Sequence, residues 1–158
     1  MRFEIMQPGQ EDLAVDLVSR TFDTFVAPEF SRDGVEEFYR FANAGALAER
    51  CQDNCFVIFA YESKAPVGLI EIRDRSHIAM FFVKEVFQRR GIGRGLLQEA
   101  IRVLTESPEV PEEITVNSSP NSVSAYATMG FQARESEQCV NGIRFVPMAL
   151  KIKSNAVQ

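Results

Sequence analysis

Residues 88–95 read Gln-Arg-Arg-Gly-Ile-Gly-Arg-Gly, and these residue types at this spacing suit the binding of a phosphate group. Glycines lack the Cβ atoms that would hold an anion away from the backbone amides. The segment opens an apolar helical stripe that continues from Leu96, and the free amides at a helix N-terminus attract negative charge. Arg89, Arg90 and Arg94 add cations to a chain whose formal net charge is -5. The segment therefore predicts a pyrophosphate cradle, and the alternative is a glycine-rich turn whose arginines point into water.

Two common phosphate-binding motifs do not match this loop. A dinucleotide-binding fingerprint requires a third glycine at position 96, where the chain has Leu96. A P-loop requires Gly-Lys followed by Ser or Thr, which the loop lacks. A dinucleotide-binding module is therefore disfavoured.

The elements that must position this loop predict a mixed α+β fold. Apolar alternation, helical spacing and turn residues give the order β-α-α-β-β-β-α-β-α-β-β. Strands are expected at residues 2–6, 55–61, 67–73, 78–83, 114–116, 131–140 and 143–152, and helices at residues 10–26, from 31 toward 47, from the loop to 104, and 119–130. The last two strands flank Asn141-Gly142, a strong hairpin signal. The length suits a single domain, residues 1–158, with residues 154–158 as a loose tail.

Composition argues against several functions. The negative net charge disfavours a protein that coats nucleic acid. The longest uninterrupted apolar stretch, residues 55–61, is too short to cross a bilayer, so we expect no membrane association. Three cysteines without a Cys-x-x-Cys pair, and a single histidine, disfavour a disulfide framework and a metal site. We expect a cytoplasmic protein without a metal.

Two ordered motifs resemble those of one enzyme family. The strand Phe81-Phe82-Val83, followed by Gln88-x-x-Gly91-x-Gly93 at a helix start, resembles the acetyl-CoA-binding motif of the GNAT superfamily of N-acetyltransferases. Downstream, Tyr126-Ala127-Thr128-Met129-Gly130-Phe131 resembles the family's Tyr-x-x-x-Gly-Phe element. The element order also matches, so the resemblance covers roughly residues 2–152. It implies a twisted, mostly antiparallel central sheet of about seven strands, flanked by four helices.

The resemblance also implies where the coenzyme binds. In the family, loop amides hold the pyrophosphate and the backbone of the preceding strand pairs with the pantetheine arm. These positions correspond to Gln88, Arg89, Arg90, Gly91, Ile92, Gly93, Arg94 and Gly95 in the loop, and to Phe81, Phe82 and Val83 in the strand. Asn117 or Ser119 lies where the family opens a V-shaped gap between two strands, and can hydrogen-bond the pantetheine. Many relatives have Asn-x-x-Ala where this chain has Ser119 and Ser122.

The implied chemistry requires a base for the ammonium proton and an acid for the departing thiolate. Tyr126 suits the second task, because a phenol with an ordinary pKa of about 10 holds a proton at neutral pH. Its alternative is packing in the core. Glu71 is the first candidate for the base, since strand alternation turns it toward the expected acceptor cleft. An ion pair with Arg73 or Arg75 is its alternative, and His77 or a chain of waters can also take the proton.

The sequence thus predicts an enzyme that moves an acetyl group from acetyl-CoA directly to a primary amine of a small molecule or peptide. No Cys-His or Ser-His motif suggests a covalent enzyme intermediate. The alternative is a noncatalytic acyl-CoA-binding regulator on the same fold, which the presence of Tyr126 disfavours. The final hairpin offers an edge for a homodimer. Helical spacing assigns the phenylalanines of the first two helices to core packing rather than to an acceptor pocket.

Overall fold

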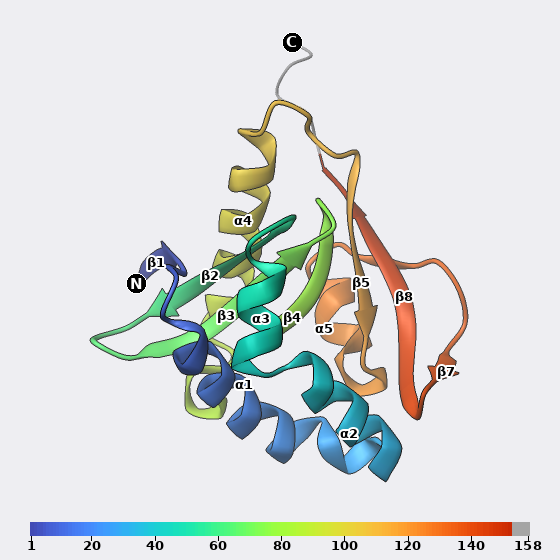
Figure 1. Ribbon diagram of the computed structural model, residues 1–158. Coiled ribbons are helices and arrows are strands. Elements are labelled where there is room, and N and C mark those ends of the chain that lie inside the picture. The colour runs from blue at the N-terminus through green and yellow to red at the C-terminus, as the bar shows by residue number, and fades with distance from the viewer. Residues whose placement is uncertain (153–158) are drawn as a thin grey trace.

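The computed structural model describes residues 1–152, so the expected loose tail at residues 154–158 lies outside the described residues. An eight-stranded sheet forms the centre, with strand order β1-β2-β3-β4-β5-β8-β6, and β7 pairs with β8 (Figure 1). The strands are β1 (Arg2–Ile5), β2 (Cys55–Tyr61), β3 (Pro66–Arg73), β4 (His77–Val83), β5 (Glu113–Ser118), β6 (Gln132–Ala133), β7 (Gln138–Val140) and β8 (Ile143–Lys151). All pairs are antiparallel except β4 with β5. The mixed α+β architecture with a mostly antiparallel sheet is confirmed.

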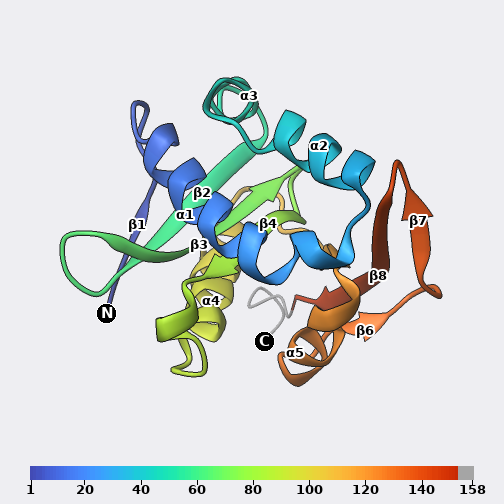
Figure 2. The same ribbon diagram turned by 90° about the horizontal axis from the view of Figure 1, so that it is seen from below.

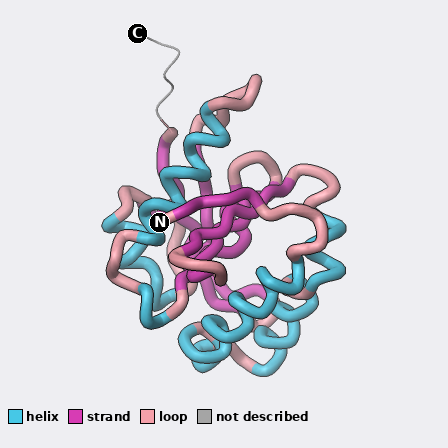
Figure 3. The backbone as a smooth tube through the Cα atoms, turned by 90° about the vertical axis from the view of Figure 1, so that its left-hand side faces the viewer, coloured by secondary structure: helices cyan, strands magenta, loops and turns pink. Residues whose placement is uncertain are grey.

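Helices cover both faces of the sheet. The helices are α1 (Glu11–Phe25), α2 (Arg32–Phe41), α3 (Ala44–Arg50), α4 (Ile92–Thr105) and α5 (Val123–Thr128). Figure 2 shows α1, α2 and α3 on one side of the strands and α4 and α5 on the other, and Figure 3 shows the strands between these layers. Each layer has its own apolar core: Leu96 of α4 packs with Ile70, and Leu17 of α1 packs with Leu69. Neighbours on β3 thus face opposite cores, as strand alternation requires.

Two parts of the predicted order are wrong in detail. The helix expected from residue 31 toward 47 is two helices, because Asn43 is extended and its side chain caps α3 by accepting from the amide of Ala46 at 2.9 Å. The strand expected at residues 131–140 is divided into β6 and β7. The described residues therefore contain eight strands and five helices instead of seven and four.

The Asn141-Gly142 hairpin is confirmed. Val140 of β7 pairs with Ile143 of β8, and the two turn residues have φ values of 53° and 79°. Positive φ at both positions is the mark of a type I′ turn, which Asn-Gly favours. This turn lies against the start of α2, where Ser31 Oγ donates to the carbonyl of Gly142 at 3.2 Å.

Strands β4 and β5 pair only where β4 begins, alongside the middle of β5. Their parallel ladder joins His77 to Thr115 and Ile78 to Val116, and goes no further. Beyond these pairs β4 continues along β3, while β5 continues along β8. The two strands therefore diverge in the middle of the sheet, and the space between them has to be filled by side chains or by a ligand. Among the described residues, no helix has the length and apolar character needed to cross a membrane.

Candidate functional site

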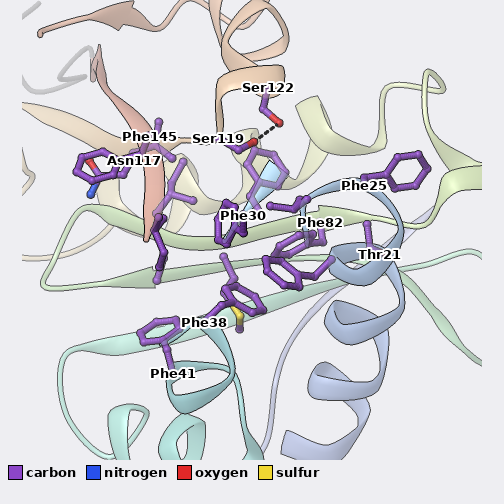
Figure 4. Close-up of a pocket in the computed structure, with 18 of the residues that line it drawn as sticks. Thr21, Phe25, Phe30, Phe38, Phe41, Phe82, Asn117, Ser119, Ser122 and Phe145 are labelled. Atoms are coloured by element: carbon purple, nitrogen blue, oxygen red, sulfur yellow. Dashed lines mark hydrogen bonds between the residues drawn. The ribbon is translucent and has the colours of Figure 1, made fainter. Parts of the chain in front are cut away.

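A cavity of about 530 Å³ opens where β4 and β5 diverge. Residues of β4, β5, β7, β8, α1, α2 and α5 line it, and in Figure 4 Asn117 and Phe145 lie on one side and Thr21 and Phe25 on the other. It is lined by all of the predicted strand and gap residues, namely Phe81, Phe82, Val83, Asn117 and Ser119, and also by Gln88 and Tyr126. The structure thus brings together residues that are up to 45 positions apart in the sequence.

The glycine-rich loop ends beside this cavity, at the N-terminus of α4. Gly91 is the N-cap and has a left-handed φ of 80°, a conformation that glycine adopts without strain. The first hydrogen bond of the helix runs from the amide of Gly95 to the carbonyl of Gly91 at 3.0 Å. The amides of Ile92, Gly93 and Arg94 precede that bond and point out of the helix end, where they can bind an anion.

Three loop residues have roles that the sequence pattern did not distinguish. The side chain of Ile92 is buried in the apolar core, so Ile92 offers only its amide to an anion at the N-terminus of α4. A Cβ on Gly93 would lie 3.7 Å from the ring of Phe81, which lines the cavity. A Cβ on Gly95 would lie only 2.7 Å from the ring of Phe3. Gly95 therefore serves close packing, and its amide is already used within the helix.

The three arginines of the loop lie beside the N-terminus of α4. Arg90 is exposed, lies 3.6 Å from Glu62 and places its guanidinium 5.3 Å from the centre of the Phe87 ring. Arg94 donates to the carbonyl of Thr128 at 3.2 Å, which ties α4 to α5. Arg89, also exposed, has a positive φ of 64°. Together these residues supply positive charge near the free amides.

Gln88 connects the loop to the cavity. Its side chain donates to the carbonyl of Val83 at 2.9 Å and also lines the cavity. The end of β4 and the start of the loop are therefore held together where the cavity meets the anion position. Gln88 therefore lies both at the cavity and at the start of the loop that leads to the free amides of α4.

Tyr126 forms part of the cavity wall where the strands diverge. Its ring contacts Phe81 edge to face at a centroid distance of 6.0 Å and Phe131 at 5.3 Å. Burial raises the pKa of the Tyr126 phenol well above its ordinary value. The hydroxyl therefore keeps its proton at neutral pH and can donate it to a group in the cavity.

Polar groups from β5 and the following turn line the cavity beside Tyr126. Asn117 is exposed and Ser119 half-buried, and both line the cavity. The Ser119 hydroxyl lies 3.0 Å from the hydroxyl of Ser122, as the dashed line in Figure 4 marks, and 3.0 Å from Asn121 Oδ1. Hydroxyls that already bond to one another are oriented in advance for a ligand amide.

This arrangement has counterparts among known proteins. The family model described as an acetyltransferase (GNAT) domain matches residues 26–152, which is most of the chain. The chain belongs to the GNAT acetyltransferase family. No curated protein gives a significant match to it.

Solved structures of GNAT proteins share the fold at low identity. A GCN5-related N-acetyltransferase from Rhodopseudomonas palustris is 18% identical with a TM-score of 0.80, over 95% of this chain and 94% of that one. The PaiA N-acetyltransferase from Thermoplasma acidophilum, solved with coenzyme A, is 18% identical with a TM-score of 0.75, over 96% and 99%. An aminoglycoside 6'-N-acetyltransferase, also complexed with coenzyme A, is 11% identical with a TM-score of 0.69, over 98% and 99%. These likenesses support the GNAT fold described above.

Glu71 does not reach this GNAT cavity. Its side chain is fully buried beneath α3, where Arg50 Nε donates to Oε2 at 2.8 Å and Arg50 Nη2 donates to Oε1 at 3.0 Å. The thiol of Cys55 donates to the same carboxylate at 3.1 Å. The prediction that Glu71 borders the acceptor cleft is therefore wrong, and its partner is Arg50 rather than Arg73 or Arg75.

His77 does line the cavity, although the sequence pattern ranked it below Glu71. Its Nδ1 lies 2.8 Å from Thr115 Oγ1, across the parallel ladder. Burial, with a further contribution from the Arg73 charge, lowers the pKa of His77 below its ordinary value of 6.5. The imidazole is therefore neutral at pH 7 and can accept a proton.

The phenylalanines of the first helices divide between core and cavity. Phe22 is fully buried and stacks on Phe38 with centroids 3.8 Å apart. Phe25, Phe30 and Phe38 are only half-buried and line the cavity together with Phe22. Helical spacing alone predicted core packing for the whole group, because it shows which face is apolar but not what that face covers.

Proposed function

We propose that this GNAT protein transfers an acetyl group from acetyl-CoA directly to a primary amine. The observation that carries the proposal is that Gln88, at the start of the loop that leads to the free amides of α4, lines the same cavity as Tyr126. The coenzyme pyrophosphate binds at the amides of Ile92, Gly93 and Arg94. The pantetheine arm follows the edge of β4 that β5 leaves free, with Asn117 and Ser119 on the opposite side of the gap.

The reaction is an attack of the neutral amine on the thioester carbonyl carbon. The new C–N bond forms while the C–S bond breaks, and the coenzyme leaves as a thiolate. Tyr126 donates its phenolic proton to that sulfur, a role supported by its place in the cavity wall. His77, directly or through water, takes up the proton that the amine loses.

A binding and turnover experiment tests the proposal. We expect acetyl-CoA to bind in calorimetry and to raise the melting temperature, because a ligand specific to the native state stabilises it. NADH serves as the control and should shift the melting temperature little. Coenzyme thiol release is then measured with a panel of primary amines.

Two results would contradict the proposal in different ways. A melting shift with NADH but none with acetyl-CoA would remove acetyl-CoA as the ligand. Binding of acetyl-CoA without thiol release for any amine would instead favour a noncatalytic acyl-CoA-binding module. The possibility of a homodimer through the final hairpin stays a prediction, as does a cytoplasmic location.

A further inference from the structure

Three phenylalanines face the cavity without belonging to either apolar core. Phe25 ends α1, Phe30 follows it, and Phe145 lies on β8 across the cavity. All three are half-buried, and neither buried core cluster includes them or packs against them. Apolar rings that contribute little to the core leave their surface available to a ligand.

Contacts between aromatic rings hold the apolar side of the cavity in place. Phe38 stacks on the buried Phe22 and meets Phe82 of β4 edge to face at a centroid distance of 6.3 Å. Phe30 also contacts Phe22 edge to face at 5.3 Å. As Figure 4 shows, Phe30, Phe38 and Phe82 gather on one side of the cavity and Phe145 lies on another. The rings are thus held from different elements, as in a preformed binding site.

The charges of the wall do not suit a polycation. Although the chain is acidic overall, Glu37 is the only carboxylate among the described residues that line the cavity, and Arg40 pairs with it at 2.6 Å. Two arginines, Arg73 and Arg144, also line it. Arg144 is held by Glu137 at 2.8 Å, and the buried Nε of Arg73 lies 3.8 Å from its nearest carboxylate, that of Asp74. An acceptor with several ammonium groups would meet two arginines here and a single carboxylate that is already paired.

We propose that the acceptor is a primary amine carried on an aromatic or bulky apolar group, without a second cationic group. This inference rests on the proposed acetyl transfer and specifies its substrate class. The rings of Phe30 and Phe145 contact the apolar body of the acceptor, and aromatic pairs favour edge-to-face or offset contacts. The same apolar wall disfavours the ammonium form and lowers the pKa of the amine, which increases the fraction of neutral nucleophile.

Matched amines test the substrate class. 2-Phenylethylamine and ethylenediamine share a two-carbon primary amine, but the second replaces the ring with another amino group, and spermidine extends the polycation. We expect kcat/KM for 2-phenylethylamine to exceed that of either polyamine by about tenfold or more, measured by coenzyme thiol release.

Variants then locate the selectivity. Phe30→Ala and Phe145→Ala should each raise KM for 2-phenylethylamine by about tenfold, since a lost ring in an apolar pocket has an effect of this order. Phe56→Ala is the control, because Phe56 is a half-buried ring of β2 that lines a different cavity, and KM should not change. Acetyl-CoA affinity by calorimetry verifies that each variant is folded.

The outcomes separate this inference from the proposed function. Faster turnover of spermidine or ethylenediamine than of 2-phenylethylamine would overturn the inference while leaving acetyl transfer intact. Binding of 2-phenylethylamine to the coenzyme A complex, with no thiol release when acetyl-CoA replaces coenzyme A, would support the aromatic acceptor pocket and contradict the transfer. Neither binding nor turnover of 2-phenylethylamine, in a protein that binds acetyl-CoA, would overturn the inference.

Discussion

Glu71 illustrates how the surroundings of one carboxylate decide its role. Its side chain is fully buried, that of Arg50 is 17% exposed, and two hydrogen bonds join them. Arg50 also donates to the carbonyl of Phe41 at 2.7 Å and lies 3.6 Å from the centre of the Phe41 ring. The pair therefore connects the end of α2 and the helix α3 to the middle of the sheet.

Removing this carboxylate should destabilise the protein without impairing chemistry. Glu71→Ala leaves the Arg50 cation without its buried partner, a change that typically costs about 3 to 5 kcal/mol. We expect a clear fall in melting temperature. Glu106→Ala, which removes an exposed partner of Arg102, is the control and should change stability by less than about 0.5 kcal/mol.

Turnover distinguishes the two roles of Glu71. Glu71→Gln keeps the shape of the side chain, so kcat per folded molecule should equal that of the unmodified protein. A large loss of kcat in a Glu71→Gln protein of normal melting temperature would restore the general-base assignment.

Local sequence could reveal Tyr126 but not the partner of Glu71. Tyr126 stands in a short motif that spans the end of α5 and the following Gly130, so both its neighbours and its element are encoded nearby. Arg50 lies 21 residues from Glu71 and reaches it only because α3 starts anew at Asn43. The apolar pattern continues through Phe41 and Ala42 and therefore predicted one uninterrupted helix.

At the scale of elements, the junction of β4, the loop and α4 forms the proposed pyrophosphate site. The sequence predicted this junction well, because glycine spacing and the apolar stripe from Leu96 are both local signals. It could not separate binding glycines from packing glycines. That distinction depends on which ring each glycine meets, Phe81 of β4 for Gly93 and Phe3 of β1 for Gly95.

Matched substitutions in α4 should separate binding from packing. Gly93→Val places branched carbons beside the free amides and next to Phe81, so the Kd for acetyl-CoA should rise about tenfold or more, equivalent to about 1.4 kcal/mol. Gly95→Val instead meets the Phe3 ring and should lower the melting temperature, with Kd little changed. Calorimetry and thermal melts measure both, and equal Kd values for Gly93→Val and the unmodified protein would remove the loop from the coenzyme site.

At the scale of the whole molecule, the cavity exists because β4 and β5 have different further partners. β4 stays with β3 as far as Val83, and β5 stays with β8 as far as Ser118. Such pairings join residues far apart in the chain, so only the family resemblance, and no local pattern, indicated a gap near Asn117. The proposed acceptor wall of Phe30 and Phe145 likewise forms only when the first helices meet the last hairpin.

The turnover of Tyr126→Phe tests the central claim most directly, namely that the thioester is cleaved in this cavity with the phenol as proton donor. The substitution removes one hydroxyl and keeps the ring contacts with Phe81 and Phe131. With the best amine of the panel, kcat should fall by about 100- to 10,000-fold, the usual contribution of a general acid, while acetyl-CoA affinity and melting temperature stay unchanged. An unchanged kcat in the folded variant would contradict the account and assign Tyr126 to packing alone.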